Sequence, residues 1–247
     1  MSKTQIVKFE DELAALAKQG VTAERSSAGT AFLSTKGGIL SYRDQPIAGN
    51  ELEVVVLASP VERLYYASRY DPTKIVGPAC FSLSTTATGM KPNATSPEPQ
   101  HDMCSGCPKD QWGSASNGGR GKACSEKRRL LIMTADSVTS ADNVGIAEVA
   151  ALRIPVTSVK GYATYLQTVA TATARPLTGV ITKIALVPDP KTQFRLQFSF
   201  VKAIDDLDIV RALISRGQRE MDNAIATAGI EEDADATPAN VTPSTKF

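Results

Sequence analysis

The stretch Cys104-Ser105-Gly106-Cys107-Pro108 decides most of what can be predicted, because its two cysteines have the spacing of a zinc knuckle. Two thiolates at this spacing can converge on one ion while the backbone amides of the turn point at the sulfurs. Two further cysteines complete the set: Cys124, after a glycine-rich arc, and Cys80, on an apolar segment upstream. Four thiolates suit tetrahedral Zn²⁺, and a site closed by four protein ligands is structural. We therefore predict one structural zinc ion.

The fourth ligand of this site is open between two residues. His101, the only histidine, lies three residues before Cys104, so a site with three cysteines and one histidine is also chemically sound. Cys80 has an alternative role as a small buried hydrophobic residue on a strand. We favour Cys80, so the expected ligands are Cys80, Cys104, Cys107 and Cys124.

The rest of the chain argues against disulfide bonds. The first ten residues are polar and mixed in charge, which is not typical of a secretory signal. No apolar run approaches the roughly 20 residues that cross a bilayer. We therefore expect a cytoplasmic protein with no membrane partner, and thiols stay reduced in the cytosol.

Outside the cysteine segment the pattern is that of short strands. Apolar runs between Thr30 and Ala67 are separated by two turn sequences, Gly37-Gly38 and Ala58-Ser59-Pro60. From Gln193 to Val201, phenylalanine and leucine alternate with polar residues, which is typical of a strand with one buried face. Further strands are expected at 130–133, 147–154 and 179–187, and helices at about 157–174 and 204–225.

The segment from about 84 to 128 is an insertion among these strands. It has few large apolar residues, so we expect it to be ordered by bound zinc and not by a core of its own. The expected fold is mainly β (α+β): an OB-like small barrel with a zinc-stapled loop insertion and flanking helices. It spans residues 1–230 as one nucleic-acid-binding domain and is followed by a disordered acidic tail at 231–247.

Charge is unevenly distributed, although the chain has 27 basic and 26 acidic residues in total. The tail holds four acids and one base, whereas the cysteine segment is basic. Trp112, the only tryptophan, lies in this basic segment and could stack on bases or pack over the zinc knuckle. The expected nucleic-acid contacts are Trp112 together with Lys109, Arg120, Lys122, Lys127, Arg128 and Arg129.

Catalytic motifs are not convincing. The glycine-rich run from Gly118 to Lys122 does not match a phosphate-binding loop, because Ser116 stands where the first glycine is needed and Ala123 follows the lysine. One histidine does not support a Ser-His-Asp set. We expect no enzymatic activity.

The cysteine segment resembles part of a group of tailed-phage proteins that are similar to phage single-stranded-DNA-binding proteins. The resemblance is carried by 104–114, 121–124 and 128–130, and upstream by 78–82 and 96–100. It covers about 78–130 well and the remainder only loosely. It implies that Cys80 is the fourth ligand and that the protein acts in phage DNA replication or recombination, in the host cytoplasm.

A second resemblance is to phage helix-destabilising proteins, which combine an OB-type barrel with an acidic C-terminal tail. It implies that the tail competes with DNA for the basic surface and that Phe247 docks replication proteins. Here the acids lie well before Phe247, and Lys246 is next to it, which departs from that pattern.

Two hypotheses of function therefore stand. The first is sequence-tolerant binding of single-stranded DNA by a protein with a structural zinc site and a regulatory acidic tail. The second is a zinc-stabilised, non-enzymatic interaction protein, such as a transcription or replication adaptor or a virion component. Binding to an oligonucleotide that weakens as salt rises would distinguish the first from the second.

Overall fold

The computed structural model describes residues 13, 16, 31–68, 76–115 and 120–228. The acidic tail at 231–247, with Phe247, lies outside these residues. Short 3-10 turns lie at Lys36–Gly38, Ala48–Asn50, Pro108–Asp110, Ala135–Ser137 and Leu177–Gly179.

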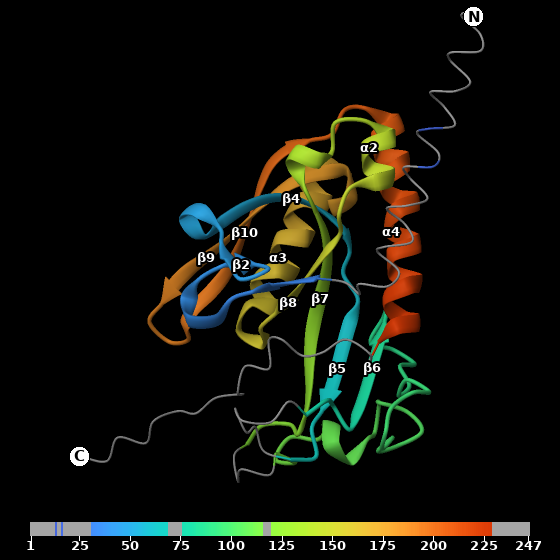
Figure 1. The fold of residues 1–247 in the computed structure, drawn as a ribbon. Helices are drawn as coiled ribbons and strands as arrows, with labels where there is room; N and C mark the ends of the chain where they lie inside the picture. Colours follow the sequence, from blue (N-terminus) through green and yellow to red (C-terminus); the bar gives the residue numbers. More distant parts are fainter. Residues whose placement is uncertain (1–12, 14–15, 17–30, 69–75, 116–119, 229–247) are drawn as a thin grey trace, which may run out of the picture.

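One sheet forms the body of the molecule (Figure 1). Its strands are β1 (Ala31–Ser34), β2 (Ser41–Tyr42), β3 (Gln45–Pro46), β4 (Glu51–Ala58), β7 (Cys124–Thr134), β8 (Ala150–Ile154), β9 (Val180–Asp189) and β10 (Gln193–Ala203). Their order is β10-β9-β4-β7-β8-β1-β2-β3. Neighbours run antiparallel except β1 and β8, which are parallel.

The long strand β7 pairs with two strands in succession, β4 and then β5 (Val61–Tyr65). Ala58 lies opposite Leu131 and Val61 lies opposite Arg128, so both strands run antiparallel to β7. The chain therefore continues through Ser59-Pro60 without reversing, and the turn predicted at Ala58-Ser59-Pro60 is wrong. The strand has a register shift before Ala58 and a break at the proline, which cannot donate a ladder hydrogen bond.

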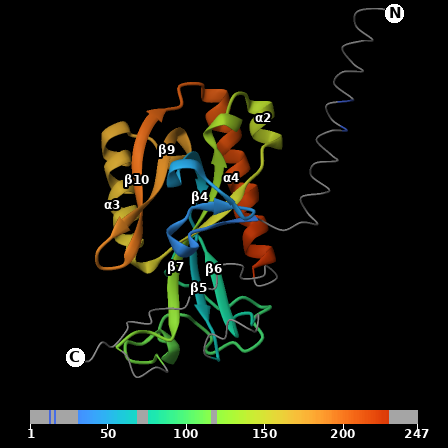
Figure 2. The ribbon, with the colours of Figure 1, turned by 60° about the vertical axis from the view of Figure 1, so that its left-hand side comes forward.

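Together with β6 (Cys80–Ser84), β5 and the first half of β7 form a three-stranded arm that extends below the body (Figures 1 and 2). The outer edge of β6 is covered by the polar segment that follows it. The Asn93 amide donates to the Phe81 carbonyl at 2.8 Å, and the Phe81 amide donates to Ser96 Oγ at 3.1 Å. Asn93 Nδ2 also donates to the Ile225 carbonyl at 3.3 Å, which ties the segment to the last helix.

Helices cover both faces of the sheet. In β4, Val54 and Val56 join a core with α3 (Val156–Thr173), whereas Val55 and Leu57 join a second core with α4 (Leu207–Thr227) and α2 (Ala141–Ile146). Because side chains alternate along a strand, one apolar run supplies both cores. The helices predicted at about 157–174 and 204–225 are confirmed, and the strands predicted at 179–187 and 193–201 form the antiparallel hairpin of β9 and β10.

The sheet curls around α3. The core on that side takes residues from β1, β4, β7, β8, β9 and β10, and Phe198 of β10 packs edge-on against Tyr162 of α3 at 5.2 Å between ring centroids. Phe194 packs so closely over Gly38 that a Cβ there would lie 2.1 Å from its ring. The fold is thus mainly β, with a curled, open half-barrel sheet and few helices. Pairing between its end strands β10 and β3 is not found in the described residues.

Candidate metal centre and nucleic-acid interface

The register of the arm places two cysteines at its far end. Tyr65 on β5 lies opposite Cys80 on β6 and opposite Cys124 on β7. Cross-strand partners share a face of the sheet, so these three side chains point to the same side. Both cysteines are half-buried there.

The knuckle lies against this same end. The Cys107 amide donates to the Cys104 carbonyl at 3.4 Å, and Gly106 has a φ of 85°, as a type II turn requires at its third residue. Both knuckle cysteines are buried. Cys104 packs with Val61 of the arm and Met90 of the loop in a small third core. The insertion therefore has an apolar anchor of its own, which the sequence analysis did not expect.

All four cysteines line one cavity of about 20 Å³, together with His101. A cavity of this size has room for one water-sized occupant, which suits a single ion. All four are free thiols. As the atoms stand, no group of three or more His, Cys, Asp or Glu among the described residues could hold a metal ion. The four thiols are the type of donor set that Zn²⁺ prefers, and binding by all four would require their sulfurs to come closer together than the structure places them.

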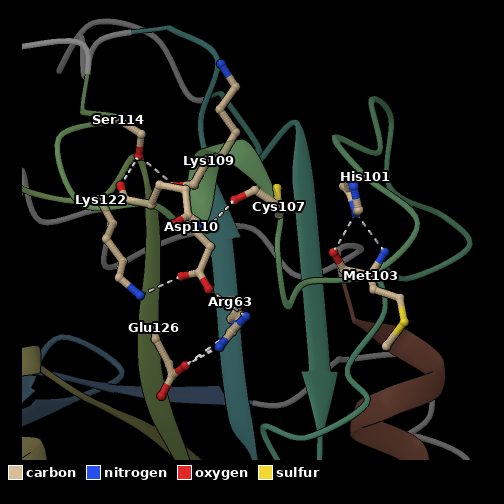
Figure 3. Close-up of polar contacts among 10 residues, drawn as sticks. Arg63, His101, Met103, Cys107, Lys109, Asp110, Ser114, Lys122 and Glu126 are labelled. Carbon is tan, nitrogen blue, oxygen red and sulfur yellow. Dashed lines mark hydrogen bonds and ion pairs between the residues drawn. The ribbon is translucent and has the colours of Figure 1, made fainter.

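His101 lies at the rim of the cavity. Its ring is exposed, and its Nδ1 contacts the Met103 carbonyl at 3.0 Å and the Met103 amide at 3.3 Å (Figure 3). The other ring nitrogen, Nε2, is the one that a metal would take. Both alternatives for the fourth ligand, Cys80 and His101, thus line the same space.

Two of the four thiols, those of Cys104 and Cys124, favour their protonated forms. Burial raises the pKa of the Cys104 thiol. Burial, and after it the Asp110 carboxylate, raise the pKa of Cys124 to about 12. A bound divalent cation reverses this preference by stabilising thiolate, so metal binding at this cavity releases protons.

Arg63 lies between the arm and the loop. It is buried on β5, where its Nη2 is 2.7 Å from Glu126 Oε2 and its Nη1 is 3.2 Å from Asp110 Oδ2. The other oxygen of Asp110 accepts from Lys122 Nζ at 2.9 Å (Figure 3). A line of alternating charges therefore joins β7, β5, the 3-10 turn Pro108–Asp110 and the end of the glycine-rich arc.

Trp112 lies on the surface of this loop. Trp112 is 79% exposed, and Lys122 Nζ lies 5.6 Å from the centroid of its ring. Packing over the knuckle, one of the two roles considered for this ring, is therefore not what the structure shows. Lys109 Nζ lies 5.0 Å from the ring centroid of Tyr65, and Arg120 is exposed nearby in sequence.

The remaining predicted phosphate contacts lie on β7 and differ from one another. Lys127 and Arg128 are half-buried and point to opposite faces of the strand. Arg129 is only 3% exposed, and its Nε donates to Glu62 Oε1 at 3.0 Å. Arg129 is thus a buried structural residue, and we remove it from the set of expected nucleic-acid contacts.

Arg129 belongs to a buried group on the α4 side of the arm. Arg153 Nε lies 2.8 Å from Glu62 Oε2, and both guanidinium groups lie over the Phe32 ring, at 5.2 Å for Arg129 and 4.4 Å for Arg153. Burial alone would raise the pKa of Glu62, but the combined attraction of the two arginines holds it below its ordinary value.

Sequence reasoning did not predict that Glu62, Arg63 and Arg153 are buried and paired. The available signal was the position of Glu62 and Arg63 between Val61 and Leu64 in a strand-like run. In a strand covered on both faces, two successive charged residues are both buried and must find partners. The pairing of β5 with β7 brings in Glu126 and Arg129, and the pairing of β7 with β8 brings in Arg153.

No protein-family model matches the chain, and no curated protein or solved structure matches it at a significant level. No helix in the described ranges is long and apolar enough to cross a membrane.

Proposed function

We propose that the protein binds single-stranded DNA, with little sequence preference, through the loop that carries Trp112. The observation that carries this proposal is the indole ring of Trp112, which is 79% exposed and has Lys122 Nζ 5.6 Å from its centroid. Proteins that bind single strands combine such aromatic surfaces with basic residues that follow the backbone. Stacking is worth about 1–3 kcal/mol per base and tolerates any sequence.

The basic residues supply the second requirement. After the removal of Arg129, the phosphate contacts proposed are Lys109, Arg120, Lys122, Lys127 and Arg128. Contacts of this kind fix the strand in place without reading its sequence. The curled sheet is the feature that the structure has in common with an OB-type barrel. The more specific expectation, that the strands follow the OB topology, is part of the proposal only.

Zinc has a structural role in this proposal. The residues that would hold it are Cys80, Cys104, Cys107 and Cys124, and the ion would fix the knuckle against the end of the arm. We propose that this activity serves phage DNA replication or recombination, in the host cytoplasm, and the resemblance of the cysteine segment to phage proteins supports this. The acidic tail then acts as a regulator of the same surface and as a docking segment for replication proteins.

The test is binding of a labelled, unstructured oligonucleotide at several salt concentrations. The expected slope of log affinity against log salt is roughly −0.7 for each phosphate contacted. Replacing the exposed Arg120 by Ala should make this slope shallower by about that amount, and single-stranded competitors should displace the label better than duplex.

Failure to bind would favour the second function, a zinc-stabilised interaction protein. The same exposed Trp112 supports that reading, because tryptophan is enriched at the centres of protein interfaces. An adaptor or virion component would show no salt-dependent affinity for the oligonucleotide.

A further inference from the structure

We propose that Arg63 is a positioning residue that couples metal occupancy at the cysteine cavity to the orientation of Trp112. Its consequence for DNA rests on the function proposed above, whereas the coupling itself does not.

The coupling follows a continuous path of contacts. Arg63 and Asp110 both line the cavity that the four cysteines share. Arg63 Nη1 lies 3.2 Å from Asp110 Oδ2, and Asp110 Oδ1 accepts from Lys122 Nζ at 2.9 Å. Lys122 Nζ then lies 5.6 Å from the ring centroid of Trp112. The path from the metal cavity to the exposed ring therefore runs through Arg63, Asp110 and Lys122, and the first two of these line the cavity.

Charge gives Arg63 its role at the cavity. Four thiolates around one Zn²⁺ carry a net charge of about −2, and a buried charge of that size needs cations beside it. Arg63 is a buried cation on the wall of this cavity. Its guanidinium has five N–H groups, and three hydrogen bonds lead from it to Glu126 and Asp110. Two of its N–H groups are therefore left to donate to a sulfur, while the other three bind the two carboxylates.

The carboxylates hold this guanidinium between the two elements that must move together. Glu126 belongs to β7, two residues after Cys124, and Asp110 belongs to the 3-10 turn that directly follows Cys107. Binding of one ion by cysteines from both elements would draw the turn toward the end of the strand. The Arg63 bridge would then transmit that movement to Asp110 and so to Lys122.

The test uses the emission of Trp112, which reports on this loop alone because the chain has one tryptophan. In the wild-type full chain, removal of Zn²⁺ with a chelator should shift the emission, and added Zn²⁺ should restore it. Arg63→Lys keeps the charge and loses the planar fork, so it should weaken Zn²⁺ affinity by about 10–100-fold, as outer-shell changes do.

Asp110→Asn and Lys122→Gln interrupt the path beyond Arg63. Both should lose the chelator-dependent shift in emission, and Lys122→Gln, at a residue outside the cavity lining, should retain bound Zn²⁺. Lys122 is partly exposed. Lys122→Gln should therefore fold even if Asp110→Asn or Arg63→Lys fails to fold. Arg195→Lys, which alters an exposed ion pair on β10 far along the chain, is the matched control and should behave as wild type.

The outcomes separate the two proposals. Wild-type Zn²⁺ affinity in Arg63→Lys, an unchanged emission response in Asp110→Asn and Lys122→Gln, or a wild-type chain that binds no Zn²⁺ would each overturn the coupling. If the emission response behaves as expected but no oligonucleotide binds, the coupling stands and the proposed function fails.

Discussion

Arg128 and Arg129 show how a single position along a strand separates a surface residue from a core residue. Both are basic and adjacent in sequence, and both were expected to contact phosphates. Arg128 lies opposite Val61 on the side of the cysteines, half-buried, whereas Arg129 points to the other face, where Glu62 receives it. The sequence indicates that adjacent side chains of a strand point to opposite faces, but it does not show that Glu62 is the partner that stabilises the buried Arg129.

At Glu62 we predict that Glu62→Gln lowers the free energy of unfolding by about 3–5 kcal/mol at neutral pH, because two buried arginines lose their shared carboxylate. The pKa of Glu62 is lower in the folded chain than its ordinary value. Its contribution is therefore complete above the unfolded pKa of about 4.3 and is lost as pH falls through the folded pKa. Thermal unfolding of both proteins from pH 7 downward measures it.

The gap in melting temperature between wild type and Glu62→Gln should thus be constant to about pH 5 and close only at lower pH. The exposed Glu53→Gln is the control and should show almost no gap. A gap that is already absent at pH 7 would show that the buried group contributes nothing.

At the scale of elements, local patterns predicted what local patterns can determine. The hairpin of β9 and β10 and the helix α3 follow from alternation and helical spacing within one segment each. The continuation of β4 into β5 along β7 does not follow from a local pattern, because Ser59-Pro60 has the composition of a turn. The arm, and with it the position of Arg63, depends on pairing between segments distant in sequence.

The candidate site was predictable to the same degree. Four cysteines were expected to share one ion, and they line one cavity. The charged residues beside them, Arg63 and Asp110, could not be expected because they come from a strand and a turn that only the fold brings together.

Helix α4 packs unusually close to β4, and this gives a prediction for Gly217. A Cβ at this position would lie 2.6 Å from the Leu57 carbonyl oxygen, and backbone cannot move aside cheaply. Gly217→Ala should therefore destabilise the protein by about 1–3 kcal/mol, although alanine favours a helix by about 1 kcal/mol. Denaturant unfolding measures the difference.

Gly161 in α3 is the matched control. Nothing lies within 4 Å of a Cβ built there, so Gly161→Ala should stabilise the protein by about 0.5–1 kcal/mol. Equal effects of the two substitutions would contradict the close approach of α4 to β4.

At the scale of the whole molecule, zinc should bind at one ion per chain. Replacing Cys80 by Ser should lower the zinc content measured by elemental analysis, because three thiolates leave the tetrahedral site open. Replacing His101 by Ala should leave the content unchanged. The reverse pattern would assign the fourth position to His101, which lines the same cavity.

The acidic tail should compete with DNA for the basic surface. Residues 231–247 hold four acids on a tether, which keeps them at high effective concentration near the loop. Deletion of 231–247 should therefore tighten oligonucleotide binding, most strongly at low salt where screening is weak. If the shortened chain binds no better than the full chain at any salt concentration, the tail does not regulate this surface.

The central claim, that Trp112 stacks on the bases of a single strand, is tested most directly by its own fluorescence. Titration of the full chain with an unstructured oligonucleotide should quench the emission saturably, and added salt should reverse the quenching. Trp112→Ala should weaken binding of a labelled oligonucleotide by roughly 5–150-fold, the equivalent of about 1–3 kcal/mol. Binding that leaves the emission of Trp112 unchanged, with equal affinity in Trp112→Ala, would contradict the account.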